Sequence, residues 1–120
     1  MVPGSQVVLR FRDGRTKRAT LVNADLDREV VHVEENGAKS EVPFANLKAV
    51  FFPSGADAQP AEAVQGSQLA VEFADGEVIR GIAQYNPERN GFFLYPLDRS
   101  KNDRIFVVNS AIMSIEVEKL

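Results

Sequence analysis

Gln6-Val-Val-Leu-Arg-Phe-Arg-Asp-Gly14 recurs further along the chain as Gln68-Leu-Ala-Val-Glu-Phe-Ala-Asp-Gly76. The likeness continues downstream, where 30–33 falls opposite 92–95 and 41–50 falls opposite 106–115. A repeat of this kind indicates two copies of one structural unit that must stack to bury its apolar face. At about fifty residues, a copy is near the lower size limit for a self-sufficient core. We therefore expect the copies to pack together or to dimerise.

Both copies carry an Asp-Gly pair between alternating apolar residues, which is one of the strongest short-range hairpin signals. Apolar side chains at every second position of 7–11 and 69–73 predict half-buried antiparallel strands. Each copy is predicted to form five short strands, with one helical turn at 44–47 or 109–112 before the last strand. Five short strands bury a core only when they curl. The sequence therefore predicts an all-β fold of two tandem five-stranded Sm/SH3-like small barrels.

Composition divides the chain into three parts. Residues 53–66 are small and polar and include Pro53 and Pro60, as is typical of a connecting arm. We accordingly predict a first barrel repeat at 1–53, a Pro/Ala/Gly linker at 54–66 and a second barrel repeat at 67–120.

The 120-residue chain is 44% hydrophobic and 26% charged, which is typical of a folded globular protein rather than a disordered one. It has no cysteine, so disulfides, thiolate chemistry and cysteine metal sites are excluded. No apolar run approaches the roughly 20 residues that span a bilayer, and no signal-peptide core is present. A cytoplasmic protein without membrane contact is expected. The net charge of −3 argues against a dedicated nucleic-acid-binding domain, which is usually strongly basic.

The second copy resembles the first motif of the Sm fold. In Gly76-Glu-Val-Ile-Arg-Gly81 four residues separate two glycines, and 86–90 supplies the Asn-containing turn that follows. Residues 105–115 have the length of the second Sm motif. RNA-binding Sm proteins carry Arg-Gly before the last strand, whereas this chain has Val108-Asn109 there and Pro43-Phe44 in the first copy. The resemblance implies an Sm-like barrel without the usual RNA-binding pair.

The repeated Phe-x-Asp-Gly barrel with its proline-containing arm also resembles an uncharacterised bacterial domain. That domain occurs alone or beside signalling modules such as PilZ, so the resemblance implies a bacterial accessory or regulatory role. The Asp-x-Ser-x-x-Gly part of the PilZ binding signature is absent from the sequence. No cyclic-dinucleotide site is therefore predicted.

A two-residue hairpin closing at Asp13-Gly14 would place four cations on one exposed face, namely Arg10, Arg12, Arg15 and Lys17. The equivalent face of the second copy is acidic, because it carries Glu72 and Glu77. Complementary faces favour contact between the copies or head-to-tail association. The four cations are also candidate contacts for an anionic partner. The alternative is that they are ordinary charges on a solvated strand, where they deter aggregation.

A second candidate contact surface is apolar. The alignment places Phe92 and Leu94 opposite Val30 and His32, on the face of the strand that points outward. Neighbouring exposed apolar side chains usually mark a contact surface. We predict that Phe92 and Leu94 line the interface between the repeats or between two chains, or else bind a partner.

Three further basic residues have less distinctive patterns. Arg18 and Arg80 occupy the same repeat position on the face predicted to be apolar. Each is interpreted as a long side chain whose stem covers the barrel mouth. The alternative is a fixed hydrogen-bonding or ion-pair role, with Asp13 and Asp75 or with a carbonyl. His32 is the only histidine, and the sequence shows no oriented partner or nucleophile for it. We interpret His32 as a surface position on a strand.

The sequence contains no phosphate-binding loop, zinc-ligand spacing, EF-hand or nucleophile elbow. We expect no enzyme activity, no cofactor and no metal. The predicted function is a non-enzymatic protein-interaction or regulatory module of bacterial type, with an unknown protein partner and possible homo-oligomerisation. One alternative is an Sm-like single-stranded RNA-binding protein, which would use aromatic stacking and a basic groove. Another is an assembly element that oligomerises through open barrel edges.

Overall fold

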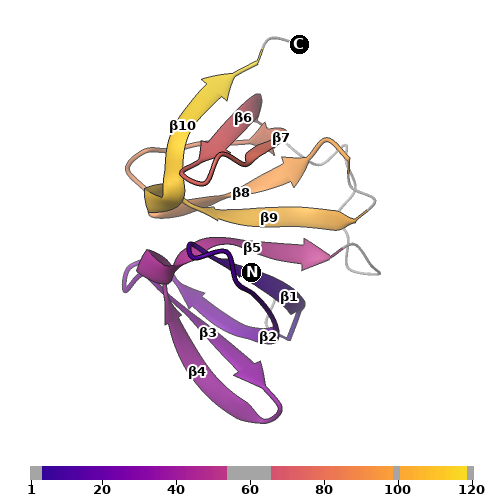
Figure 1. Ribbon diagram of the computed structural model, residues 1–120, viewed down its shortest axis with the longest axis vertical. Coiled ribbons are helices and arrows are strands. Elements are labelled where there is room, and N and C mark those ends of the chain that lie inside the picture. The colour runs from indigo at the N-terminus through magenta and orange to yellow at the C-terminus, as the bar shows by residue number, and fades with distance from the viewer. Residues whose placement is uncertain (1–3, 54–65, 99–100, 119–120) are drawn as a thin grey trace.

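The chain is all-β. A computed structural model describes residues 4–53, 66–98 and 101–118, which form ten strands and two single 3-10 turns (Figure 1). The first half of the chain contains β1 (Gln6–Phe11), β2 (Thr16–Asp25), β3 (Val30–Glu35), β4 (Ala38–Pro43), η1 (Phe44–Asn46) and β5 (Leu47–Pro53). The second half contains β6 (Ser67–Phe73), β7 (Val78–Ala83), β8 (Gly91–Pro96), β9 (Asn102–Val108), η3 (Asn109–Ala111) and β10 (Ile112–Val117).

All ten strands belong to one antiparallel sheet that does not close on itself. The strand order is β10-β6-β7-β8-β9-β5-β1-β2-β3-β4. The two halves therefore have the same strand order. In each half the fifth strand pairs with the first, and the fourth strand lies at the opposite end of that half. The halves meet where β5 pairs with β9, and these two strands lie side by side across the middle of the molecule (Figure 1). We call this pairing the β5–β9 joint.

The two strands of the joint are buried on both faces, because apolar side chains cover them from either side. Every residue of β5 before Pro53 is buried, and so is every residue of β9 after Asn102. Val50 of β5 points to one face of the sheet and lies in register with Leu9 of β1. Phe51 points to the other face and lies in register with Ile105 of β9. The joint consequently contributes a wall to the apolar core of each half.

Aromatic rings continue the core across the joint. The ring of Phe106 in β9 lies 5.7 Å from that of Phe44 in η1 and 5.4 Å from that of Phe93 in β8, measured between centroids. Phe52 of β5 in turn lies 5.8 Å from Phe93. Tilted and edge-on pairs at such distances stabilise a core beyond the area they bury. The four rings join the two halves into one packed body.

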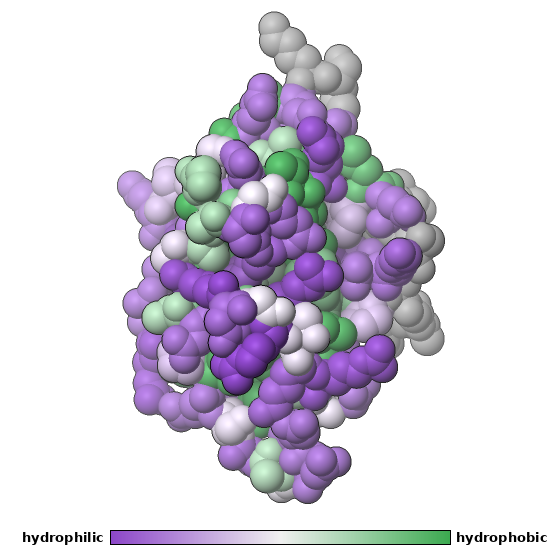
Figure 2. Space-filling view, in the orientation of Figure 1, coloured by the Kyte–Doolittle hydropathy of each residue, from purple (hydrophilic) through white to green (hydrophobic). Residues whose placement is uncertain are grey.

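Apolar surface is unevenly divided between the halves. On the face shown in Figure 2, hydrophilic residues predominate, and hydrophobic residues reach the surface chiefly in the upper part, over the second half of the chain. The large hydrophobic residues exposed within the described part of the chain all belong to that half: Val78, Tyr85, Leu97, Met113 and Val117.

Both Asp-Gly hairpins form, but their turns contain three residues rather than the predicted two. In the first hairpin the amide of Phe11 donates to the carbonyl of Arg15 at 2.9 Å, and the amide of Gly14 donates to the carbonyl of Phe11 at 3.1 Å. Gly14 has φ +94°, and Gly76 in the equivalent turn has φ +92°. A three-residue turn ending in a left-handed glycine is common in hairpins. It moves the strand register by one residue from the predicted one.

The prediction that Phe92 and Leu94 face outward is wrong. Phe92 is 6% exposed and Leu94 is fully buried, and both belong to the core. The strand pairing explains the error. Leu21 and Ala83 are equivalent positions in the two copies, and Leu21 pairs with Val33 whereas Ala83 pairs with Leu94. Leu94 is therefore the counterpart of Val33. The register between β2 and β3 shifts at Val22, so β2 contains one extra residue there. A slip of one residue transfers a whole strand from one face to the other.

In the structure, β5 ends at Pro53 and β6 begins at Ser67. The predicted linker lies outside the described residues except for Gly66. The two halves share one sheet and a continuous core instead of packing as separate sheets.

Candidate functional site

The four cations predicted to share one face are dispersed in the structure. Arg10 reaches across to Glu77 of the second half, and Arg15 pairs with the aspartate of its own turn, where its Nε lies 2.7 Å from Oδ2 of Asp13. The three-residue turn places Lys17 opposite Leu9, on the other face from Arg10. There its Nζ lies 2.8 Å from Oε2 of Glu35. The prediction of a continuous basic strip is therefore wrong.

Arg12 holds together the two 3-10 turns. Its Nε donates to the carbonyl of Leu47 at 2.9 Å, and its Nη2 donates to the carbonyl of Phe44 at 3.0 Å. Nη2 also lies 2.5 Å from Oγ of Ser110 in η3. A guanidinium has five N–H donors in a fixed fork, so it suits this role. Arg12 thus connects the end of the first half to the end of the second.

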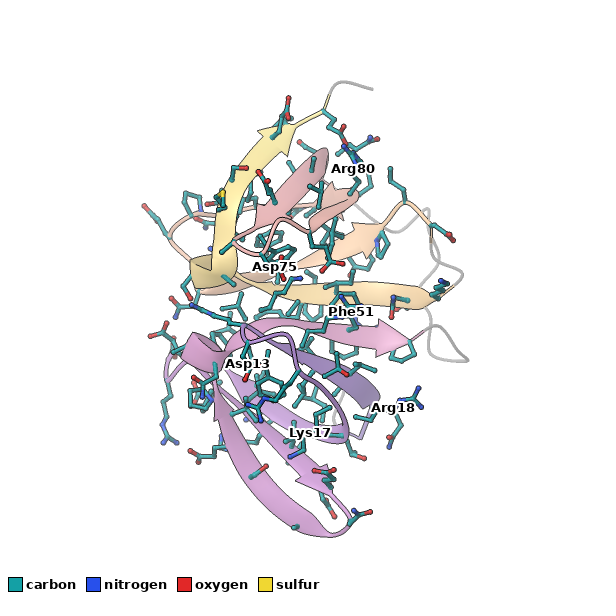
Figure 3. The ribbon with its side chains drawn as sticks, viewed as in Figure 1. Asp13, Lys17, Arg18, Phe51, Asp75 and Arg80 are labelled. Atoms are coloured by element: carbon teal, nitrogen blue, oxygen red, sulfur yellow. The ribbon has the colours of Figure 1, made fainter. Side chains whose placement is uncertain are left out.

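Charged side chains gather where the β6–β7 hairpin lies over the joint. Asp75, at the tip of that hairpin, lies near the middle of the molecule, whereas Asp13 lies in the lower half (Figure 3). Lys48 of β5 is 6% exposed, and its Nζ contacts Oδ2 of Asp75 at 2.7 Å and Oε1 of Glu77. Nη1 of Arg10 lies 3.2 Å from each carboxylate oxygen of Glu77. We call Arg10, Lys48, Asp75 and Glu77 the joint ion cluster.

Aromatic faces support both cations of the joint ion cluster. The guanidinium carbon of Arg10 lies 4.4 Å from the ring centroid of Phe51, and Nζ of Lys48 lies 4.9 Å from that of Phe73. Cation–π contacts of this kind are attractive and orient the cation. The predicted electrostatic complementarity between the hairpins is confirmed at Arg10 and Glu77. Sequence reasoning missed Lys48. The signal that could have located it is the apolar run that follows, which indicates a strand covered on both sides.

The ammonium of Lys48 lowers the pKa of Asp75, and the amide of Glu77, which donates to Oδ1 at 2.9 Å, lowers it further. A carboxyl group whose pKa is lower in the folded state stabilises the fold above its unfolded pKa, about 3.9 for Asp. That stabilisation is lost as the pH falls through the folded value.

We expect Lys48→Met to narrow the difference in unfolding free energy between pH 7 and pH 3, since the charged form of Asp75 then loses its main partner. Urea titrations at the two pH values measure this difference. Lys39→Met, which removes an exposed cation of β4, is the matched control and should leave the difference unchanged. An equal pH 7 to pH 3 difference in Lys48→Met and the parent chain would contradict the assigned role of Lys48.

A hollow of about 390 Å³ lies beside the joint ion cluster, and Arg15, Thr16 and Gly14 form its other side. Each of its three cations, Arg10, Arg15 and Lys48, contacts a carboxylate, so it offers no concentrated positive charge for a phosphate. A second hollow of about 490 Å³ lies over β2, β3 and β4. Here Nδ1 of His32 lies 3.7 Å from Oε1 of Glu41, so the predicted surface-strand histidine is half-buried beside a carboxylate.

Arg18 and Arg80 do not lie on the apolar face. They are exposed and lie in register with Val8 and Ala70, on the outer side of their strands. Nε of Arg80 lies 3.5 Å from Oε2 of Glu118. The predicted pairing of Arg80 with Asp75 is wrong, because the carboxylate of Asp75 contacts Lys48 instead.

A buried ion pair at the joint was also missed by sequence reasoning. Asp103 and Arg104 of β9 are 2% and 7% exposed, and Nη1 of Arg104 lies 2.7 Å from Oδ2 of Asp103. The guanidinium carbon of Arg104 lies 4.3 Å from the ring centroid of Phe52. No motif in the sequence marks this pair, since adjacent acidic and basic residues are common on surfaces.

The open sheet has two edges of different character, β4 and β10. Neither pairs with a further strand within the described residues. The β4 edge is polar and exposed, with Lys39 and Glu41 along it and Pro43 at its end. The β10 edge carries exposed apolar side chains, since Met113 is 61% exposed and Val117 is 65% exposed.

Over residues 4–53, 66–98 and 101–118, His, Asp and Glu side chains do not gather into a group that could hold a metal ion. The same residues contain no helix with the length and apolar character needed to cross a membrane. No curated protein and no solved structure matches the chain. The model of a family of unknown function does match, over residues 4–119, and the chain therefore belongs to that family, DUF6982.

Proposed function

We propose that this protein is a non-enzymatic interaction module of the bacterial cytoplasm that binds a partner protein by accepting one of its strands at the β10 edge. Its two halves are copies of one Sm/SH3-like small barrel, joined through β5 and β9. The single observation that carries the proposal is that β10 ends the sheet with the apolar side chains of Met113 and Val117 exposed.

The contrast between the two edges supports this choice. Edge strands expose backbone donors and acceptors, and proteins usually guard them with lysine, proline or inward charge. The β4 edge has such guards in Lys39 and Pro43. The β10 strand has neither residue type between Ile112 and Val117, and its exposed side chains include Met113. An apolar edge that remains accessible is suited to strand addition, in which backbone hydrogen bonds supply affinity.

The β5–β9 joint supports the proposal from within the molecule. There the last strand of one half accepts the fourth strand of the other. β10 is the last strand of the second half and stands in the position that β5 has in the first. A strand added to β10 would therefore use an arrangement that this fold already adopts once.

The dispersal of the basic residues favours a protein partner over single-stranded RNA. Arg10, Arg15 and Lys17 each lie against a carboxylate, and Arg12 donates to backbone carbonyls. RNA binding draws on a positive groove with accessible aromatic rings. The exposed aromatic residue of the described chain is Tyr85, which lies outside this group of cations.

A displayed library of random eight-residue peptides provides the test. We expect the selected peptides to shift the amide resonances of β10 in the labelled protein, and Met113→Lys/Val117→Lys to abolish binding by guarding the edge. Both replaced side chains are more than half exposed, so the fold should persist. Leu97→Lys, at a residue 55% exposed beyond β8, is the matched control and should bind normally.

Two outcomes would overturn the proposal. One is that the selected peptides shift resonances elsewhere and the double lysine variant still binds them. The other is that a short mixed-sequence RNA binds at low salt and dissociates as salt rises, which would favour the nucleic-acid function instead.

A further inference from the structure

We propose that the strand accepted by β10 alternates aliphatic residues with lysine or arginine. This inference rests on the proposed function, because it describes the occupant of the same edge. It follows from the two different rows of side chains that flank the edge.

The row on the inner face of β10 is apolar. Ile115 lies in register with Val71 of β6, and Val117 lies in register with Leu69. Both partners on β6 are buried, and Ile115 is partly buried against the core. Val117 is 65% exposed, so the apolar layer of the second half extends to the edge without a cover. Alternate side chains of an added strand would continue this layer if they were aliphatic.

The row on the outer face is acidic. Glu116 of β10 is exposed and lies in register with Ala70, and Ser114 lies in register with Glu72. Oγ of Ser114 is 3.2 Å from Oε1 of Glu72, which holds that carboxylate beside β10. Glu118 continues the row past the end of the strand.

Within the described part of the chain, one cation balances part of this acidic row. Arg80 on β7 lies 3.5 Å from Glu118, on the side of the row away from the edge. Glu116 and Glu72 therefore leave negative charge next to the place of an added strand. Opposite charges on directly facing strand positions are favourable, and like charges are unfavourable. Basic side chains at the outward positions of the occupant match this row.

Three synthetic eight-residue peptides separate the charge preference from strand addition itself. The first alternates valine with lysine, the second valine with threonine, and the third valine with glutamate. In NMR titrations, we expect the lysine peptide to cause the largest shifts of the β10 amide resonances. Its affinity should exceed that of the threonine peptide by about tenfold at low salt and approach it as salt screens the charges. The glutamate peptide should bind least.

Charge removal at the edge gives the second arm. Glu116→Gln should reduce the affinity of the lysine peptide towards that of the threonine peptide, and it should leave the threonine peptide unaffected. Asp27→Asn makes the same change of charge in an exposed turn of the first half, and it should alter neither affinity.

The outcomes distinguish this inference from the proposed function. Equal affinity of the lysine and threonine peptides at β10, or an unchanged preference in Glu116→Gln, would overturn the charge preference while strand addition stands. If no peptide shifts the β10 resonances, strand addition fails and the preference fails with it.

Discussion

Phe106→Ala should lower the free energy of unfolding by about 3–5 kcal/mol, the usual cost of truncating a buried phenylalanine. Phe106 is 2% exposed, and its ring contacts those of Phe44 and Phe93, which belong to different halves of the chain. Removing the ring leaves a cavity at the β5–β9 joint that neither half can fill alone. Urea unfolding followed by far-ultraviolet circular dichroism measures the loss. Phe106→Leu retains most of the apolar volume and should cost clearly less.

The same variant tests whether the halves fold as one unit. Because the ring contributes to both sides of the joint, unfolding should remain a single transition, with Val33 in the first half and Leu94 in the second losing structure together. Residue-resolved spectra during urea titration would show this. Two separate transitions, with only the second half weakened, would contradict a shared core.

Gly81→Ala should also be strongly destabilising, by about 3 kcal/mol as an overpacked site. A Cβ at Gly81 would lie 2.3 Å from the carbonyl oxygen of Tyr95 and 2.5 Å from Cδ2 of Leu94. The first contact is with backbone, so β7 could accept the methyl group only by moving away from β8. The two strands share a short stretch of pairing from Gly81 to Ala83, which such a movement would break.

Gly37→Ala is the matched control for the glycine at β7. Gly37 has φ +81° but open space around the position of a Cβ, so its cost is limited to the left-handed backbone, about 1–2 kcal/mol. Thermal unfolding of the two variants compares the effects. A smaller loss of stability in Gly81→Ala than in Gly37→Ala would show that β8 is not held closely against β7.

Local patterns in the sequence predicted local structure well. The alternation at Val7, Leu9 and Phe11 gave the correct inner face of β1, since Val7 and Leu9 are buried. The Asp-Gly pairs marked both hairpins, and the short helical turns appear as η1 and η3. These features depend on neighbours a few residues apart, which a sequence displays directly.

Errors arose wherever a single extra residue changed the side on which a strand presents its side chains. The third residue of the Asp13-Gly14 turn moved Lys17 to the inner face, and the irregularity at Val22 shifted the match between Val33 and Leu94. A strand repeats every two residues, so an uncertainty of one residue reverses the result completely. Turn type and bulges therefore limit such predictions more than hydrophobic pattern does.

The joint itself could not be predicted, because it pairs strands from different copies. The run Ala49-Val-Phe-Phe52 signals a strand covered on both faces, yet nothing in it names β9 as the cover. The joint ion cluster shares this limitation, since Lys48 and Asp75 come together only after the halves have paired.

The joint also has a consequence for the nascent chain on the ribosome. β5 is complete when residue 53 has been made, but β9 begins at Asn102, so residues 54–101 must be translated before the partner of β5 exists. Until then the first half emerges with an apolar strand that its own residues cover only in part. Translation proceeds at about 5–20 residues per second, and non-local pairing is slow. The first half is thus held incomplete for seconds, with the edge of β5 that later pairs with β9 still uncovered.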